Sequence, residues 1–268
     1  MLEEFISNII FLIVSLGASI VGAICGVGGG IIIKPVLDTI GMMSVSSISF
    51  LSGCTVLSMS IISVFKNMKN NSNKNMNLKI STLLGVGSAI GGILGSRVFQ
   101  YLKILLNDDN KVGAVQALVL IIITIATLIY VKNLDKIKTM NVTNLYLCIF
   151  IGLVLGLISA FLGIGGGPIN LVVLSYFFSM KTKTAAANSI YIIMFSQSTS
   201  FLSTLISKNI PDFNVKTLVV MILGGIAGGI IGNKINGNIS TKKVDNIFTY
   251  LILIIISINL YNFLKFSI

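Results

Sequence analysis

Long apolar segments follow one another along nearly the whole of this 268-residue chain, and they restrict its fold more than any other feature. They run at about 5–40, 44–65, 80–102, 112–131, 142–178, 185–207, 215–235 and 246–266. A helix needs roughly 20 residues to cross a bilayer, so each segment is long enough. Charged residues make up 10% of the chain, against about 25% in soluble domains. The alternating pattern of a transmembrane barrel is missing. The sequence therefore predicts an all-α integral membrane protein that crosses the lipid bilayer several times.

Two of these segments are too long for one crossing, and each is interrupted by a glycine cluster of the same form. The clusters are Gly26-Val27-Gly28-Gly29-Gly30 and Gly163-Ile164-Gly165-Gly166-Gly167. Backbone that is not helical survives at membrane depth only where it is buried in protein or lines a wet cavity. Interruptions at matching places in two halves of a chain point to the substrate site of a transporter. We therefore expect the substrate to bind at the two clusters.

The clusters belong to an internal repeat, because the chain aligns with itself at an offset of 137 residues, which brings Gly26 onto Gly163. The alignment continues without a gap for more than 80 residues. In it Gly91-Gly92-x-x-Gly95-x-Arg97 falls on Gly228-Gly229-x-x-Gly232-x-Lys234. We divide the chain into membrane repeat 1 (residues 1–131), a linker (132–141) and membrane repeat 2 (142–268), with four hydrophobic segments in each repeat.

The basic residues indicate how the two repeats are oriented, because cytoplasmic loops carry an excess of lysine and arginine. If every segment crosses once, ten basic residues face one side and eight the other, which is no bias. If the two glycine-broken segments are re-entrant and return to the side they entered, the repeats are inverted and the split is twelve to six. The twelve are Lys66, Lys69, Lys74, Lys79, Lys132, Lys136, Lys138, Lys181, Lys183, Lys234, Lys242 and Lys243, and the six are Arg97, Lys103, Lys111, Lys208, Lys216 and Lys265. We favour two inverted repeats, with both chain termini outside the cell.

A helix that restarts after a glycine-rich break presents unpaired N–H groups and a partial positive charge at its new N-terminus. Such an end binds an anion without any charged side chain. We therefore predict a small anionic substrate between the two clusters, bound by Gly26, Gly28, Gly29, Gly30, Gly163, Gly165, Gly166 and Gly167. Close helix packing by small residues is the alternative explanation for the same glycines.

Five side chains complete the predicted binding site, namely Lys34, Ser52, Asn188, Ser189 and Gln197. The amides of Asn188 and Gln197 are difficult to place against lipid, so both are expected to face the interior. Lys34 lies inside an apolar run, where a cation indicates function. It is also four residues before Asp38, a spacing at which two side chains pair along a helix.

The residue types that are missing narrow the mechanism. The chain has no histidine, and of its eight carboxylates only Asp38 is expected at membrane depth. Cys25, Cys54 and Cys148 have no metal-ligand spacing. We therefore expect no metal, no cofactor, no catalytic residue and no proton relay, so the chain is not expected to be an enzyme. Passive or facilitated anion movement, or coupling through the protonation of the substrate itself, fits better. The net charge of +11 is assigned to membrane topology rather than to nucleic-acid binding.

The chain resembles the sulfite exporter TauE/SafE family, also called the toluene-sulfonate uptake permease family. The resemblance rests on the repeated Gly-x-Gly-Gly-Gly, on Pro35, on Ala185-x-x-Asn188-Ser189 and on the repeated Gly-Gly-x-x-Gly motif, and it covers nearly the whole chain. It implies a multi-pass permease of the bacterial inner membrane for sulfur-containing or organic anions such as sulfite, thiosulfate, sulfonates and sulfoacetate. The chain departs from the family pattern at Val172, where a proline is expected, and at Ser49-x-x-Ser52, where Ala-x-x-Thr-Ser is usual.

Two other functions remain open at this point. One is a permease for another small organic anion or solute, and the other is a membrane assembly module that transports nothing. The sequence assigns no oligomeric state.

Overall fold

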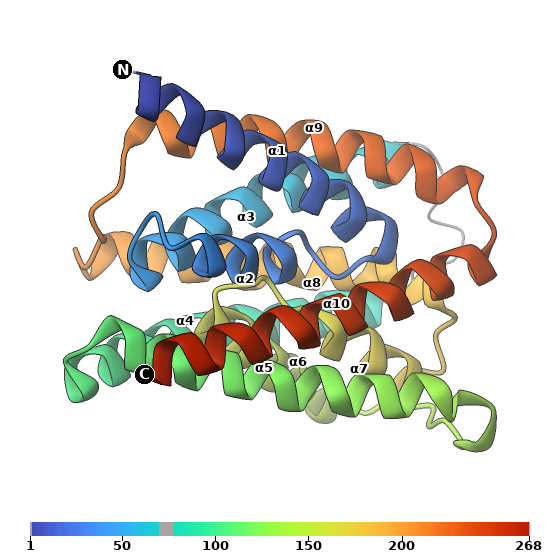
Figure 1. Ribbon diagram of the computed structural model, residues 1–268. Helices are drawn as coiled ribbons and strands as arrows, with labels where there is room; N and C mark the ends of the chain where they lie inside the picture. The colour runs from blue at the N-terminus through green and yellow to red at the C-terminus, as the bar shows by residue number, and fades with distance from the viewer. Residues whose placement is uncertain (1, 70–77, 268) are drawn as a thin grey trace.

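The computed structural model describes residues 2–69 and 78–267, which form helices and loops without any strand (Figure 1). Lys74, one of the basic residues counted above, lies outside the described residues. The helices are α1 (Leu2–Cys25), α2 (Gly30–Ile40), α3 (Val45–Lys69), α4 (Leu78–Leu106), α5 (Asp109–Lys132), α6 (Leu145–Leu162), α7 (Pro168–Phe178), α8 (Thr182–Ile206), α9 (Val215–Asn238) and α10 (Thr241–Ser267), with a 3-10 turn η2 at Leu134–Lys136. Of these described helices, eight are long and apolar enough to cross a membrane. The protein is therefore an all-α, multi-pass membrane protein.

The two long apolar segments are each divided into two helices, and both divisions fall at the glycine clusters. The first lies between α1 and α2, and the second between α6 and α7. Gly163 ends α6 in the left-handed conformation, with φ at 65°, which disfavours any side chain there. Pro168 occupies the first turn of α7, where its missing N–H costs nothing. The restarted helices α2 and α7 have 11 residues each, about half of what a crossing requires.

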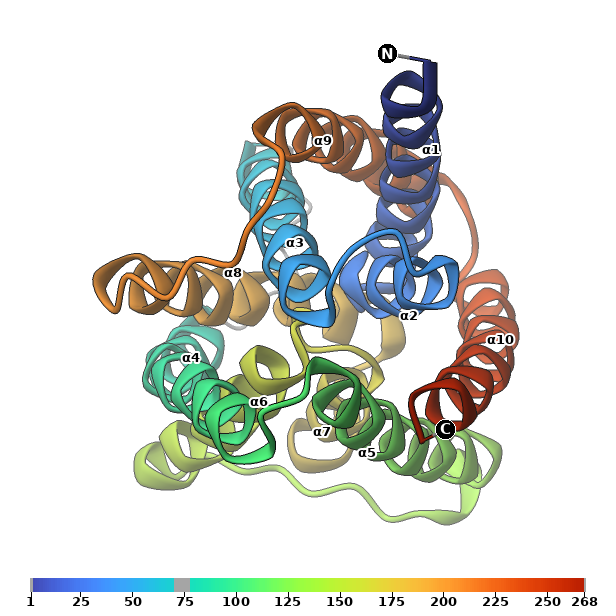
Figure 2. The same cartoon turned by 60° about the vertical axis from the view of Figure 1, so that its left-hand side comes forward.

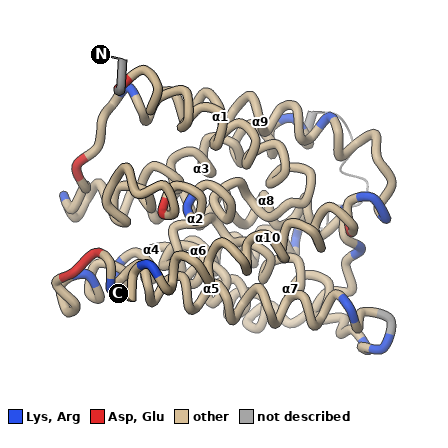
Figure 3. Tube along the Cα trace, in the orientation of Figure 1, with Lys and Arg blue, Asp and Glu red and all other residues tan. Residues whose placement is uncertain are grey.

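The loops and chain ends gather at two opposite sides of the helix bundle (Figures 1 and 2). The termini side carries both chain ends and the connections at 41–44, 107–108 and 207–214. The lysine side carries the connections at 133–144, 179–181 and 239–240. Helix α1 starts at the termini side and α2 returns to it, whereas α6 starts at the lysine side and α7 returns there. Charged residues are concentrated near these two sides, apart from one lysine and one aspartate in α2 (Figure 3).

The closest helix pairs join the first half of the chain to the second. Every fourth residue on one face of α4 is a glycine that lies directly on the backbone of α6, and α9 meets α1 in the same way. A Cβ atom added at any of these positions would approach a backbone carbonyl oxygen too closely: Gly87, Gly91 and Gly95 on α4, and Gly228 and Gly232 on α9. Small residues let backbones approach in this way. The two halves of the chain are therefore interleaved in space.

Candidate functional site

The two glycine loops, residues 26–29 and 163–167, are buried in the middle of the structure and touch each other. The N–H of Gly167 donates a hydrogen bond to the carbonyl of Val27 over 3.2 Å. A Cβ atom added at Gly28 would lie 3.3 Å from the carbonyl oxygen of Gly165, and one at Gly30 would overlap the carbonyl of Ile164. The loops therefore pack backbone against backbone, and side chains are excluded from the contact.

Several N–H groups in these loops have no protein acceptor. Within the described residues, no hydrogen bond is donated by the backbone N–H of Gly28, Gly29, Gly165 or Gly166. More than nine in ten buried N–H groups in proteins are paired, so a cluster of unpaired ones is costly. Successive N–H groups at the start of a helix also carry a partial positive charge. This arrangement has the chemistry to bind an anion, which is what the sequence predicts for these glycines.

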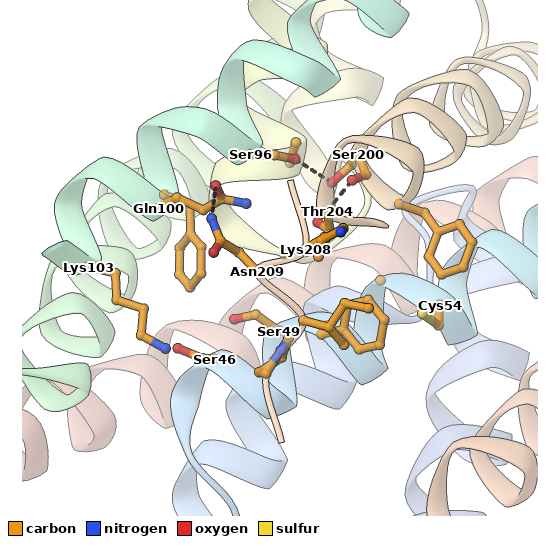
Figure 4. Close-up of a pocket in the computed structure, with 18 of the residues that line it drawn as sticks. Ser46, Ser49, Cys54, Ser96, Gln100, Lys103, Ser200, Thr204, Lys208 and Asn209 are labelled. Carbon is orange, nitrogen blue, oxygen red and sulfur yellow. Dashed lines mark hydrogen bonds between the residues drawn. The ribbon is translucent and has the colours of Figure 1, made fainter. Parts of the chain in front are cut away.

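A cavity of about 480 Å³ leads from the termini side toward the second loop (Figure 4). Its walls come from the first part of α3, the last part of α4, the end of α8 and the connection that follows α8. Its inner boundary includes Gly163 of the second glycine loop and Gln197 of α8. The volume falls in the range of about 300–1,000 Å³ that is typical of small-molecule sites.

The cavity wall carries positive charge and hydrogen-bonding side chains. Lys103 and Lys208 line it, and none of its lining residues is an aspartate or glutamate. Lys103 forms a long ion pair with Asp109, at 3.6 Å, while among the described residues no ion pair or hydrogen bond involves the Lys208 ammonium group. Charge of one sign in a cleft with low-dielectric walls concentrates ions of the opposite sign. The cavity therefore favours the entry of anions.

Of the thirteen predicted site residues, two line the cavity, namely Gly163 and Gln197. Gln197 is 3% exposed, and its Nε2 donates a hydrogen bond to Ser159 Oγ over 3.2 Å. The remaining predicted glycines, Gly26, Gly28, Gly29, Gly30, Gly165, Gly166 and Gly167, are buried behind the cavity in and around the loop contact. An anion that reaches the end of the cavity meets the second loop first.

The predicted polar side chains away from the cavity are also buried. Ser52 is inaccessible, and its hydroxyl has no hydrogen-bond partner. Asn188 donates to the carbonyl of Thr184 and accepts from the hydroxyl of Ser81. Ser189 accepts a hydrogen bond of 3.3 Å from Asn170 in the first turn of α7. Asn188 and Ser189 therefore stabilise the packing around the second loop, and neither lines the cavity.

Lys34 and Asp38 form an ion pair in α2, with 2.6 Å between Nζ and Oδ2. Lys34 is 3% exposed and Asp38 is 5% exposed. Helix α10 holds the end of the same helix, because Lys265 donates to the carbonyls of Asp38 and Thr39. Asp38 therefore compensates the positive charge of Lys34 within α2. Lys34 does not line the cavity.

Apart from Gln197, the polar side chains of the cavity wall were not among the predicted site residues. These residues recur every three or four positions: Ser96, Gln100 and Lys103 on α4, with Asn107 directly after the helix, and Ser200 and Thr204, which follow Gln197 on α8. Residues at this spacing share one face of a helix. Ser96 and Ser200 are hydrogen-bonded over 2.7 Å, and Gln100 accepts from Asn209 over 3.0 Å. A polar face on each of two otherwise apolar helices was the sequence pattern that could have indicated this cavity.

Comparison with known proteins assigns the family. The family model described as "Sulfite exporter TauE/SafE" matches residues 11–260. A probable membrane transporter protein of Bacillus subtilis, YunE, is 24% identical over 93% of this chain and 96% of its own length. A probable membrane transporter protein of Methanocaldococcus jannaschii, MJ0441, is 28% identical over 88% of each chain. No solved structure gives a significant match. The chain described here therefore belongs to the sulfite exporter TauE/SafE family of membrane transporters.

Proposed function

We propose that this protein is a permease that moves a small sulfur-containing anion of the sulfite, thiosulfate, sulfonate or sulfoacetate class across the bacterial inner membrane. The anion binds at the two glycine loops, through the N–H groups at the starts of α2 and α7. The observation that carries the proposal is the position of the second loop at the inner end of a cavity that has lysines and no carboxylate in its lining, with the first loop in contact behind it. The unpaired N–H groups supply donors for an oxyanion, which has only acceptor oxygens.

The two repeats are inverted relative to each other, with a re-entrant hairpin at the start of each. Three features support this part of the proposal. Helices α1 and α2 form a hairpin open to the termini side, and α6 and α7 form one open to the lysine side (Figure 1). At the offset of 137 residues, α1 corresponds to α6 and α4 to α9, so the α1–α9 and α4–α6 contacts correspond to each other. The glycines of these contacts also correspond, since Gly91 and Gly95 fall on Gly228 and Gly232.

The lysine side faces the cytoplasm in this proposal, and the termini side faces outward. The connections and helix ends of the lysine side carry most of the basic residues, which is the bias expected of cytoplasmic loops (Figure 3). The cavity therefore opens to the outside, and the anion passes Lys208 and Gln197 on its way to the loops. Tags on both termini that are accessible only from the cytoplasm would contradict this orientation.

A permease for another organic anion is the second candidate, and the aromatic part of the cavity wall favours it. Phe50, Phe99 and Phe201 all line the cavity, and Phe50 stacks on Phe201 with 6.1 Å between ring centroids. A bare inorganic oxyanion has no apolar part to place against these rings. The substrate panel described below therefore includes two aromatic anions, toluenesulfonate and benzoate.

Flux measurements in proteoliposomes test both candidates. Purified protein is reconstituted, and uptake of radiolabelled sulfite, thiosulfate, toluenesulfonate, sulfoacetate, benzoate and phosphate is measured with and without a pH gradient. Saturable uptake of a sulfur anion supports the proposal, and uptake of benzoate alone supports the second candidate. No uptake of any of these anions would refute the proposed function.

A matched pair of glutamine variants connects the flux to the cavity. Gln197→Leu removes an amide at the inner boundary of the cavity, and Gln116→Leu removes a buried amide on α5, where Gln116 donates to the carbonyl of Phe161 over 2.7 Å. Each variant loses one hydrogen bond, a cost of about 1 kcal/mol in stability. We expect only Gln197→Leu to raise the KM for the anion. Equal effects on KM would remove Gln197 from the substrate route.

A further inference from the structure

The cavity has a counterpart at the lysine side that is closed in this structure, and the sequence repeat identifies its residues. Adding 137 to a residue of repeat 1, or subtracting 137 from one of repeat 2, converts one set into the other. Ser46, at the start of α3, corresponds to Lys183 at the start of α8. Phe99, near the end of α4, corresponds to Asn236 near the end of α9. Gly163, at the inner end of the cavity, corresponds to Gly26.

We propose that the anion leaves toward the lysine side through a second passage between α1, α3, α8 and α9, and that Lys183 and Asn236 hold this passage shut. The inference rests on the proposed function, since a passage has meaning only for a transported solute. The structure then represents the state that is open toward the termini side. The opposite state arises when the start of α8 moves away from the end of α9.

The contacts of Lys183 and Asn236 close the passage. The Lys183 ammonium group donates to the carbonyls of Asn236, at 2.7 Å, and Ile239, at 2.5 Å. These carbonyls belong to the end of α9, where the last four have no helical partner and the helix dipole is negative. The side chain of Asn236 in turn donates to the carbonyl of Ile24 in α1. Lys183 and Asn236 together thus join α8, α9 and α1 at the point where the passage would open.

The corresponding place at the termini side is open. Ser46 bonds to Asp109 of α5, at 3.1 Å, and forms no hydrogen bond with the end of α4. Instead the cavity lies between the start of α3 and the end of α4. The glycines differ in degree in the same sense: a Cβ atom at Gly26 would overlap the Cα atom of Ala186, whereas one at Gly163, which borders the cavity, would lie 3.2 Å from the Cα atom of the corresponding Ser49. The start of α3 and the end of α4 are therefore apart at the termini side, whereas the corresponding start of α8 and end of α9 are in contact at the lysine side.

Buried polar atoms mark the wall of the closed passage. Ser63 Oγ and Asn233 Nδ2 are buried and have no hydrogen-bond partner among the residues that the structure describes. Their counterparts are Ser200 and Ser96, which bond to each other in the wall of the open cavity. A buried polar group without a partner is destabilising, and water that enters a passage would hydrate it. The closed state therefore carries a cost that the contacts of Lys183 have to offset.

Thiol labelling of one matched pair of positions tests the passage. In a background where Cys25, Cys54 and Cys148 are replaced by alanine, single cysteines are introduced as Ser63→Cys and Ser200→Cys. The proteins are placed in lipid nanodiscs, where both faces are accessible, and labelled with a charged, membrane-impermeant maleimide. With the native Lys183 we expect fast labelling at position 200 and slow labelling at position 63.

The Lys183→Met variant should reverse this preference. We expect labelling at position 63 to become at least about tenfold faster and labelling at position 200 to become slower. The variant loses the hydrogen bonds of the Lys183 ammonium group, and hydrogen bonds from a charged group are stronger than those between neutral groups. Asn236→Leu should act in the same direction, and Lys183→Arg should keep most of the native pattern. Lys181→Met is the matched control, since Lys181 is an exposed lysine two residues away whose ammonium group forms no hydrogen bond or ion pair with the described residues.

Two outcomes would overturn the inference, and neither depends on transport. One is equal labelling at position 63 in the Lys183→Met and Lys181→Met proteins. The other is faster labelling at both positions, which would mean general loosening instead of an exchange between two states. Thermal unfolding curves of each variant separate loosening from exchange. Flux in proteoliposomes is measured in parallel: the expected labelling without any flux refutes the proposed function, and flux without the labelling change refutes the passage.

Discussion

The buried ion pair between Lys34 and Asp38 allows a direct test of how much a charge pair inside this fold contributes to stability. Both side chains are almost fully buried, and one carboxylate oxygen, Oδ1, has no hydrogen-bond partner. Removing one member leaves the other charge unpaired in a medium of low dielectric constant. We expect Lys34→Met and Asp38→Leu each to lower the free energy of unfolding by about 3–5 kcal/mol, the usual cost of breaking a buried pair.

The double variant should behave differently, because replacing a whole buried pair by apolar residues is often neutral or stabilising. We expect Lys34→Met/Asp38→Leu to be more stable than either single variant by about 3 kcal/mol or more. The free energy of unfolding is measured by titration of the purified protein with sodium dodecyl sulfate in mixed micelles. If the two single effects simply add in the double variant, the charges do not interact, and the reasoning from the 2.6 Å contact is refuted.

The same double variant also tests the sequence-based hypothesis that Lys34 contacts the substrate. A folded double variant with native anion flux would make Lys34 a purely structural residue. A folded double variant that has lost its flux would assign Lys34 to the substrate route. Flux of the single variants is not informative, because their instability affects it in either case.

Three further variants test the loops, the cavity and the position of α2. Gly165→Ala should abolish flux and lower stability, because the added Cβ atom would overlap a methyl group of Val56 in α3 and because Gly165 has a φ of 76°, which disfavours a side chain. Gly237→Ala is the control, since a Cβ atom there has nothing within 4 Å, and it should have little effect on flux. Lys208→Gln should raise the KM for an anion about two- to fivefold at low ionic strength and less at high salt, while Lys216→Gln, outside the cavity, should not. Asn262→Leu removes two hydrogen bonds of 2.8 Å between α10 and α2, one donated to the carbonyl of Pro35 and one accepted from the hydroxyl of Thr39. It should lower the free energy of unfolding by about 1–3 kcal/mol without changing KM. Proteoliposome flux and detergent unfolding provide the measurements for all three.

The helix breaks were predictable from the sequence because their causes are local. Glycine tolerates a positive φ, and Pro168 begins a helix without losing an N–H bond. The structure has positive φ at Gly26, Gly28 and Gly163, inside the predicted clusters. The number of long apolar helices followed from segment length in the same way. These features depend on residue types within a few positions, so one sequence is enough to find them.

The cavity was not predicted, because its position depends on packing between distant helices. Its polar wall combines α4 with α8, whose serines Ser96 and Ser200 are 104 positions apart along the chain. Hydrophobicity identifies a segment as membrane-spanning but does not specify which neighbour a polar face meets. For Lys34 the sequence offered both a substrate contact and a pair with Asp38, and the structure has the pair. The spacing of residues along one helix therefore predicted a side-chain contact, whereas the sequence did not predict which helices face each other.

The glycine contacts between α1 and α9 have a consequence for biosynthesis. Helix α1 leaves the ribosome before the other described helices, but the partner that fits its backbone begins at Val215. At a synthesis rate of about 5–20 residues per second, α9 follows α1 after roughly 10–40 s. Helix α6, in contrast, finds α4 already in the membrane when it is made. The α4–α6 pair is thus expected to assemble early and the α1–α9 pair late. In a chain truncated before α9, helix α1 would face lipid or the insertion machinery without its glycine-rich partner.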